Sequence, residues 1–214
     1  MTSEEKDPTV VVDASVRIVA LVGGAVRVDR EVRLAADQGL AGGYAACVAD
    51  DGSFLAADNG GSFHYVADGV ARRIPAQDNN LGSCAWIDQD HAIWDQEDRR
   101  IAIWDRGSQA IRYVAGVSGE DPTSGGGRTA IVSRSNVLHI VSLDASTGMA
   151  NTLEGDTLEG VSRAALSGDG QWLLVWLLHE TIRLYRVDAT GLHADAEVSI
   201  EPGQGAIWAT AWSE

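Results

Sequence analysis

The hydrophobic positions of the chain fall in short runs that alternate with polar residues, and clusters of Gly, Asp, Asn and Ser separate these runs. The runs are five to eight residues long and rich in Val, Ile, Trp and Tyr, which is typical of β-strands. Residues 101–105 and 182–187 show the period of two most clearly. No segment longer than ten residues combines the helical period with capping residues. The pattern therefore predicts an all-β chain.

Four segments repeat one arrangement, in which an apolar run is followed by an Asp and then by a Gly. The aspartates are Asp68, Asp105, Asp144 and Asp188, and their spacings are 37, 39 and 44 residues. A repeat of about 40–45 residues is the period of a four-stranded propeller blade. The repeats therefore predict a small β-propeller.

The strands of three blades can be placed at residues 44–76, 82–115 and 161–200. A further blade is expected within residues 125–155, but the strand assignment of residues 117–155 stays open. Three N-terminal strands (9–14, 16–21 and 26–35) and one C-terminal strand (206–213) would together complete a fifth blade and close the ring. We therefore predict about five four-stranded blades in a single domain, residues 9–214, after a disordered tail, residues 1–8. Whether the ring closes within one chain or by association stays open.

Residues 101–116 resemble the third-to-fourth-strand passage of a WD40 repeat, because Trp104-Asp105 ends the third strand. Residues 181–188 are similar to the same passage with substituted positions. The resemblance covers most of the chain between residues 44 and 200 and implies a WD40-like β-propeller. A seven-bladed ring would need about 280–315 residues. The chain has 214 residues and is too short for it.

The two cysteines occupy matching positions, since Cys47 and Cys84 each lie four residues before an Asp, at Asp51 and Asp88. The alignment places them on the innermost strands of neighbouring blades. A disulfide needs a Cα separation of about 4.4–6.8 Å, and neighbouring blades are expected to lie farther apart there. We therefore predict two buried free thiols. With no secretory signal and no apolar run near 18 residues, the predicted location is cytoplasmic.

The composition and motifs argue against several classes of function. A net charge of −15 disfavours nucleic acid and anionic membranes as partners. Residues 88–98 are acidic but lack the glycine of a calcium loop, and the five histidines show no metal-binding spacing. No G-x-S-x-G elbow is present, and the glycines at 125–127 do not stand between a strand and a helix. The sequence therefore predicts a protein that is not an enzyme and has no cofactor or metal.

The predicted binding residues lie on loops that gather on one face of the ring, where propellers present variable residues. These loops include residues 120–123 and a mixed polar patch around the second blade. Tryptophans on innermost strands would line the mouth of the channel beside that patch. The predicted site consists of Asp78, Asn79, Asn80, Trp86, Gln96, Glu97, Asp98, Arg99, Arg100 and Trp208.

Three functions are compatible with this pattern. The first is a non-enzymatic protein-interaction or scaffold module that binds a protein partner or joins a larger assembly through one propeller face. The second is a lectin-like propeller that binds carbohydrate through its Trp, Asn and Asp side chains. The third is a channel-centred hydrolase, which would need two carboxylates about 5–9.5 Å apart.

Overall fold

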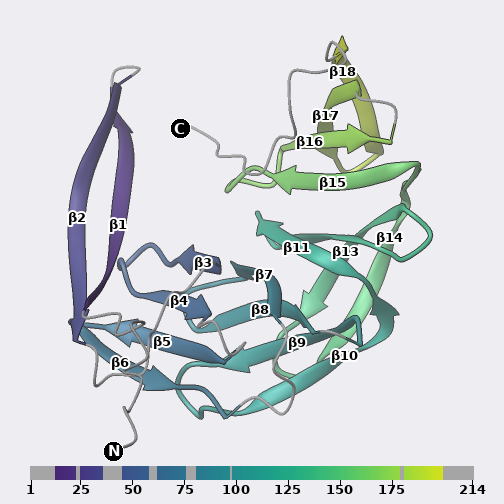
Figure 1. The fold of residues 1–214 in the computed structure, drawn as a ribbon. Helices are drawn as coiled ribbons and strands as arrows, with labels where there is room; N and C mark the ends of the chain where they lie inside the picture. The colour runs from purple at the N-terminus through teal and green to yellow at the C-terminus, as the bar shows by residue number, and fades with distance from the viewer. Residues whose placement is uncertain are drawn as a thin grey trace, which may run out of the picture.

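Eighteen β-strands and no helix form the part of the chain that the structure describes, which confirms the all-β prediction. The structure is a computed structural model, and it describes residues 13–22, 25–35, 45–57, 62–75, 81–96, 98–178 and 181–199. β1 (Asp13–Val22) and β2 (Ala25–Ala35) form a long antiparallel hairpin. The sixteen strands after it form four successive groups of four, which we number blades 1 to 4 and which follow one another in an arc (Figure 1).

Each blade is an antiparallel meander in chain order, from an inner strand to an outer strand. Blade 1 consists of β3 (Ala45–Val48), β4 (Phe54–Ala57), β5 (Phe63–Ala67) and β6 (Val70–Arg73). Blade 2 consists of β7 (Leu81–Trp86), β8 (His91–Gln96), β9 (Arg100–Asp105) and β10 (Ile111–Ser118). Blade 3 consists of β11 (Glu120–Gly125), β12 (Arg128–Val132), β13 (Val137–Asp144) and β14 (Met149–Glu159). Blade 4 consists of β15 (Val161–Leu166), β16 (Trp172–Leu177), β17 (Thr181–Asp188) and β18 (Gly191–Ser199).

The inner strands β3, β7, β11 and β15 contact one another in that order. The outer strands of blades 2 and 3 also meet, through a single parallel pair between Ala115 and Met149. The meanders place their turns on two opposite faces. The aspartate face carries the first and third turns of the blades, residues 49–53, 68–69, 87–90, 105–110, 126–127, 144–148, 167–171 and 189–190. The mouth face carries the second turns and the connections between blades, including residues 98–99, 119, 133–136 and 160.

Side chains on the middle strands of blade 2 alternate between two apolar cores. Trp94 and Trp104 pack toward blade 1, against Leu55 and Phe63. Ile93 and Ile103 point the other way, into a cluster that includes Ile131 and Val141 of blade 3. Because both sides of the blade are buried, the central residues of the two strands, 92–94 in β8 and 101–104 in β9, are all apolar. Each large apolar side chain buried in this way stabilises the fold by about 1.5–3 kcal/mol.

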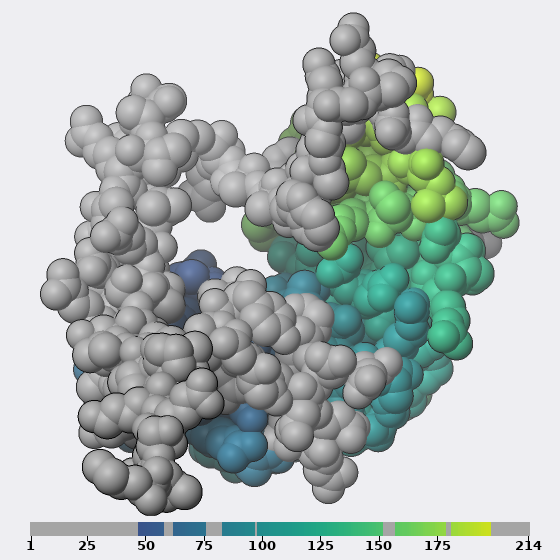
Figure 2. Space-filling model, in the orientation of Figure 1, coloured from purple at the N-terminus to yellow at the C-terminus, as the bar shows by residue number. Residues whose placement is uncertain are grey.

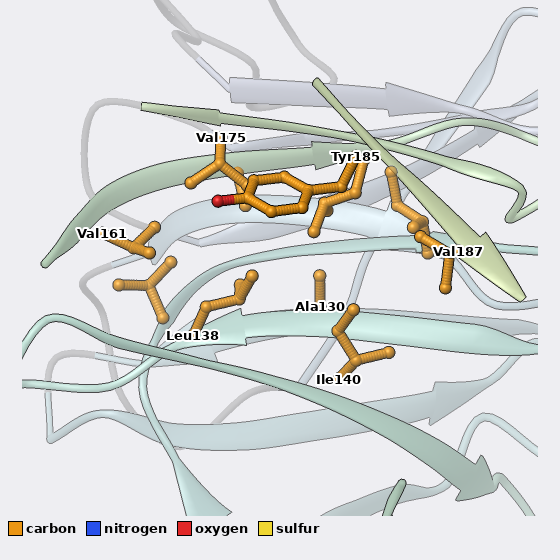
Figure 3. Packing of buried hydrophobic residues seen from close by; sticks show 11 residues of the cluster. Ala130, Leu138, Ile140, Val161, Val175, Tyr185 and Val187 are labelled. Atoms are coloured by element: carbon orange, nitrogen blue, oxygen red, sulfur yellow. The ribbon is translucent and has the colours of Figure 1, made fainter. Parts of the chain in front are cut away.

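A third core joins blades 3 and 4 (Figure 3). Leu138 and Ile140 of β13 pack against Val175, Tyr185 and Val187 of blade 4. The described residues of the two blades accordingly form a continuous surface in the space-filling view, running from teal to yellow-green (Figure 2). Successive blades therefore hold each other by stacking their flat faces, as a propeller requires.

Blade 3 occupies Glu120 to Glu159, wider than the expected 125–155. Its inner strand β11 has the sequence Glu-Asp-Pro-Thr-Ser-Gly, which reads as a turn, so no strand could be placed there from composition. The N-terminal prediction also needs correction, because β1 runs unbroken where two strands, at 9–14 and 16–21, were expected. Residues 9–12 and the predicted C-terminal strand at 206–213 lie outside the described residues. Among the described residues, no helix is long and apolar enough to cross a membrane.

The prediction of free thiols is wrong, because Cys47 and Cys84 form a disulfide with a Cα separation of 5.7 Å. Their matching positions on the inner strands of neighbouring blades are as predicted. We expected the inner strands of neighbouring blades to lie too far apart for a disulfide, but β3 and β7 contact each other directly. That contact brings the two Cα atoms within the range that a disulfide needs.

Candidate functional site at the mouth face

The structure brings together only part of the predicted binding patch. Gln96, Asp98, Arg99 and Arg100 lie together where β8 turns into β9. Trp86 lies at the other end of blade 2, since the strand register pairs Trp86 with Ala92 but Leu81 with Gln96. Asp78, Asn79, Asn80, Glu97 and Trp208 lie outside the described residues.

Trp86 has structural partners on the aspartate face. Its indole Nε1 donates to the carbonyl oxygen of Cys47 at 3.2 Å. Its ring packs against Tyr65 and Trp104, with centroid distances of 6.4 and 6.2 Å. The Arg106 guanidinium lies over the same ring, 5.9 Å from its centroid. These contacts tie Trp86 to the junction of blades 1 and 2.

The turn that follows β8 combines a buried amide with exposed charges. Gln96 is only 2% exposed, and neither its Oε1 nor its Nε2 has a hydrogen-bond partner. It therefore lies beneath the mouth face. Asp98 and Arg100 form an ion pair, and the Arg100 guanidinium lies 4.1 Å from the centroid of the Tyr113 ring. Asp98 and Arg100 are accordingly exposed to solvent on the mouth face.

Asp95 is a functional candidate that sequence reasoning missed. Asp95 lies two residues after Ile93 on β8, so its side chain is on the same side of blade 2, the side that faces blade 3. The residue is only 7% exposed. The backbone N–H of Ser83 donates to Asp95 Oδ1 at 2.8 Å. Burial raises the pKa of Asp95 to about 6, and the carboxylates of Asp121 and Glu120 act in the same direction.

Asp95 belongs to a charged group that we call the mouth cluster: Asp95, Arg99, Glu120, Asp121 and Arg163. Arg99 Nη1 lies 3.3 Å from Glu120 Oε2, and Arg163 Nε lies 3.6 Å from Asp121 Oδ2. The carbonyl of Arg99 also accepts from the Gly119 N–H at 2.9 Å. The mouth cluster contains residues of blades 2, 3 and 4, which lie together near one end of the inner strands. Spacing along the sequence could not reveal it.

Two residues of the mouth cluster adopt left-handed backbone conformations. Arg99 has a φ of 64° and Asp121 a φ of 51°. Such values are uncommon for residues other than glycine, and an arginine gains no local hydrogen bond from them. Each costs on the order of 1–3 kcal/mol, and positions of this kind concentrate at binding sites.

The aspartates of the opposite face have a structural role. Hydrogen bonds from Ser53 lower the pKa of Asp51 to about 2, and bonds from Thr190 do the same for Asp188. Arg106 links the first turn of blade 1 to the first turn of blade 2, because its guanidinium pairs with Asp51 at 2.6 Å and with Asp90 at 3.3 Å. Turn N–H groups also bond to Asp88, Asp105, Asp144 and Asp169. The turn hydrogen bonds therefore explain three of the four repeated Asp residues of the sequence, Asp105, Asp144 and Asp188.

Across the described ranges, no group of three His, Cys, Asp or Glu side chains is arranged to hold a metal ion. The mouth cluster alternates carboxylates with arginines, which suits it to charged or hydrogen-bonding groups of a partner.

Comparison with known proteins supports the fold alone. No family model and no curated protein matches the chain. Among solved structures, the chain is similar to the β-propeller domain of Cps50 (Swd1) from Myceliophteria thermophila, with a TM-score of 0.62 and 14% identity. The match covers 87% of this chain and 74% of that one. With four blades already described, the chain is a β-propeller.

Proposed function

We propose that this propeller is a non-enzymatic protein-interaction module and that its partner docks on the mouth cluster. The fold supports the first part, because stacked blades form a rigid support on which turns can vary. The β-propeller domain of Cps50 (Swd1) shares this arrangement of blades.

The observation that carries the proposal is the buried carboxylate of Asp95. Burying a charge costs stability unless the charge is fully paired. Asp95 accepts a backbone hydrogen bond from Ser83, and the charged groups that raise its pKa are the carboxylates of Asp121 and Glu120. A titratable group whose pKa is strongly shifted by burial and by neighbouring charges is a marker of a candidate functional site. A basic group from a partner would offset both the energetic cost of burying the Asp95 charge and the repulsion from the neighbouring carboxylates.

The charge of the cluster indicates the kind of partner. Asp95, Glu120 and Asp121 supply three carboxylates, while the two arginines are already paired with Glu120 and Asp121. The net charge of −15 would also attract a basic protein over longer distances. We therefore propose that the bound segment carries Lys or Arg. We also propose a cytoplasmic location for the protein.

A charge reversal tests the site. The immobilised full chain is incubated with extract of the source cells, and retained proteins are compared between wild type, Glu120→Lys and Asp195→Lys. Asp195 is exposed on the outer strand β18, away from the mouth cluster, so it serves as the matched control. We expect Glu120→Lys to reduce retention of a basic protein at least about tenfold and Asp195→Lys to leave it unchanged. Equal retention of the basic protein by the wild type and both variants would show that the mouth cluster is not the docking site.

A hydrolase is the second candidate, because Asp95 and Asp121 influence each other electrostatically and Asp95 has a pKa of about 6. Turnover of chromogenic glycosides that Asp95→Asn abolishes would support it. A lectin has less support in the described part of the chain, where Trp94 and Trp104 are fully buried and Trp86, Trp172 and Trp176 are half-buried. None of these five rings is freely presented to a sugar.

A further inference from the structure

Blade 1 has the shortest strands among the four blades. Its strands are four, four, five and four residues long, whereas those of blade 2 are six to eight residues long. Short strands form few ladder hydrogen bonds and bury little surface, so such a unit opens at a lower free energy than its neighbours. Its attachment to blade 2 therefore decides how firmly it stays in the ring.

Among the described residues, three further kinds of contact join the blades besides the hydrogen bond from Trp86 to the carbonyl oxygen of Cys47. The core between the blades packs Leu55 and Phe63 against Trp94 and Trp104. On the aspartate face, Arg106 of blade 2 pairs with Asp51 of blade 1 at 2.6 Å. The third contact is covalent, the disulfide between Cys47 and Cys84.

The disulfide lies at the edge of the core between blades 1 and 2, against which both cysteines pack. Both cysteines are half-buried, on inner strands that border the axis of the ring. The following residue, Val48, is 44% exposed. The noncovalent contacts between the blades remain when the bond is broken, so we expect the reduced protein to stay folded while blade 1 opens more readily.

We propose that the Cys47–Cys84 disulfide is a redox-reversible clamp that fixes blade 1 to blade 2. The reductant would be a dithiol. One of its thiolates attacks a protein sulfur and displaces the other cysteine as a thiolate, which takes up a proton. The second thiol of the reductant then attacks the mixed disulfide and releases the first cysteine. Two electrons pass to the protein, which holds two thiols, and the reductant becomes a disulfide.

The neighbourhood of Trp86 would report the change. Trp86 follows Cys84 on β7 and donates to the backbone carbonyl of Cys47, so it bridges the two strands that the disulfide joins. Loosening of this junction would also disturb the Arg106–Asp51 pair and the packing of Trp86 on Tyr65. Reduction would therefore alter the aspartate face at the junction of blades 1 and 2.

The test uses the full chain in native buffer, at a series of ratios of reduced to oxidised dithiothreitol. Alkylation with iodoacetamide counts the thiols by mass, and hydrogen exchange follows each blade. We expect two thiols to become alkylated while the protein stays folded. Exchange in residues 45–57 and 62–75 should accelerate at least about tenfold, with residues 161–178 unchanged. Reoxidation should restore protection.

The double variant Cys47→Ser/Cys84→Ser is the matched control. It should show the fast exchange of blade 1 at every dithiothreitol ratio. If this variant does not fold, the titration of the wild-type protein decides alone. Thiols that react only after global unfolding, or acceleration spread evenly over all four blades, would overturn the clamp. Two reactive thiols in the protein before any reductant is added would overturn it as well.

Discussion

At the scale of single residues, the site combines features that work against stability. Asp95 buries a carboxylate, Gln96 buries an unpartnered amide, and Arg99 and Asp121 adopt left-handed conformations. The polar character of residues 96–100 was visible in the sequence. The role of Asp95 was not, because the carboxylates that act on it, Glu120 and Asp121, come from blade 3. Residues that cost stability and cluster on one face are candidates for selection by function.

Asp95→Asn should stabilise the protein at neutral pH. The pKa of Asp95 is raised from 3.8 to about 6 in the folded state. The folded state therefore binds more protons than the unfolded state between those values, and the free energy of unfolding falls as pH rises through this window. Asparagine does not ionise, so the variant should lack that fall and gain on the order of 2–3 kcal/mol at pH 7.

Urea unfolding of both proteins at pH 4 and pH 7 measures the effect. The two should differ little at pH 4, where the wild-type carboxyl is largely protonated in the folded state. Parallel pH dependence of wild type and variant would show that Asp95 is not the titrating group.

Gln96→Met should also raise the free energy of unfolding, by about 1–2 kcal/mol. The substitution removes two buried polar atoms that lack partners and nearly conserves the volume of the side chain. Gln171→Met is the control, because Gln171 is exposed and its substitution should change stability by less than about 0.5 kcal/mol. Thermal unfolding compares the two variants. A destabilised Gln96→Met would mean that the amide has a partner in solution.

At the scale of strands and turns, the sequence predicted strands best where apolar and polar residues alternate without interruption. Residues 101–105, where the period of two is clearest, lie in β9, and residues 182–187 lie in β17. β11 was missed because Pro122 and Gly125 are typical of turns. Pairing with β12 and contacts with the neighbouring inner strands β7 and β15 hold the segment extended. Whether this segment forms a strand depends on its tertiary packing, about which the local sequence pattern holds no information.

The glycines of the β11–β12 turn show a similar dependence on packing. Gly126 has a φ of +56°, and a Cβ there would lie 2.1 Å from the carbonyl oxygen of Asp169 in the first turn of blade 4. Gly127 has a φ of +75° but open space around it. Gly126→Ala should therefore lose more than about 2 kcal/mol, and Gly127→Ala only about 1 kcal/mol. Equal losses, measured by urea unfolding, would mean that the two turns do not touch.

At the scale of the whole molecule, the disulfide shows what the repeat could and could not predict. Cys47 and Cys84 are 37 residues apart, which equals one of the spacings of the repeated Asp. The repeat therefore predicted equivalent positions on adjacent blades. The distance between those positions depends on how closely the inner strands pack, and the sequence does not state it.

Removing the disulfide should destabilise the oxidised protein. A cross-link that closes a loop of this length contributes on the order of 3–4 kcal/mol by restricting the unfolded chain. The Cys47→Ser/Cys84→Ser protein should unfold at correspondingly lower urea concentration, with no effect of added dithiothreitol. Unchanged stability relative to the oxidised wild type would show that the bond contributes nothing to the fold.

The central claim, that a partner docks on the mouth cluster of the propeller, is tested most directly by hydrogen exchange of the full chain with and without the retained partner. We predict slower exchange at residues 98–100, 119–121 and 161–163, which three blades bring to one face. Exchange at the aspartate-face turns, residues 87–90 and 105–110, should stay the same. Protection of the aspartate-face turns with no change at the mouth cluster would contradict the account.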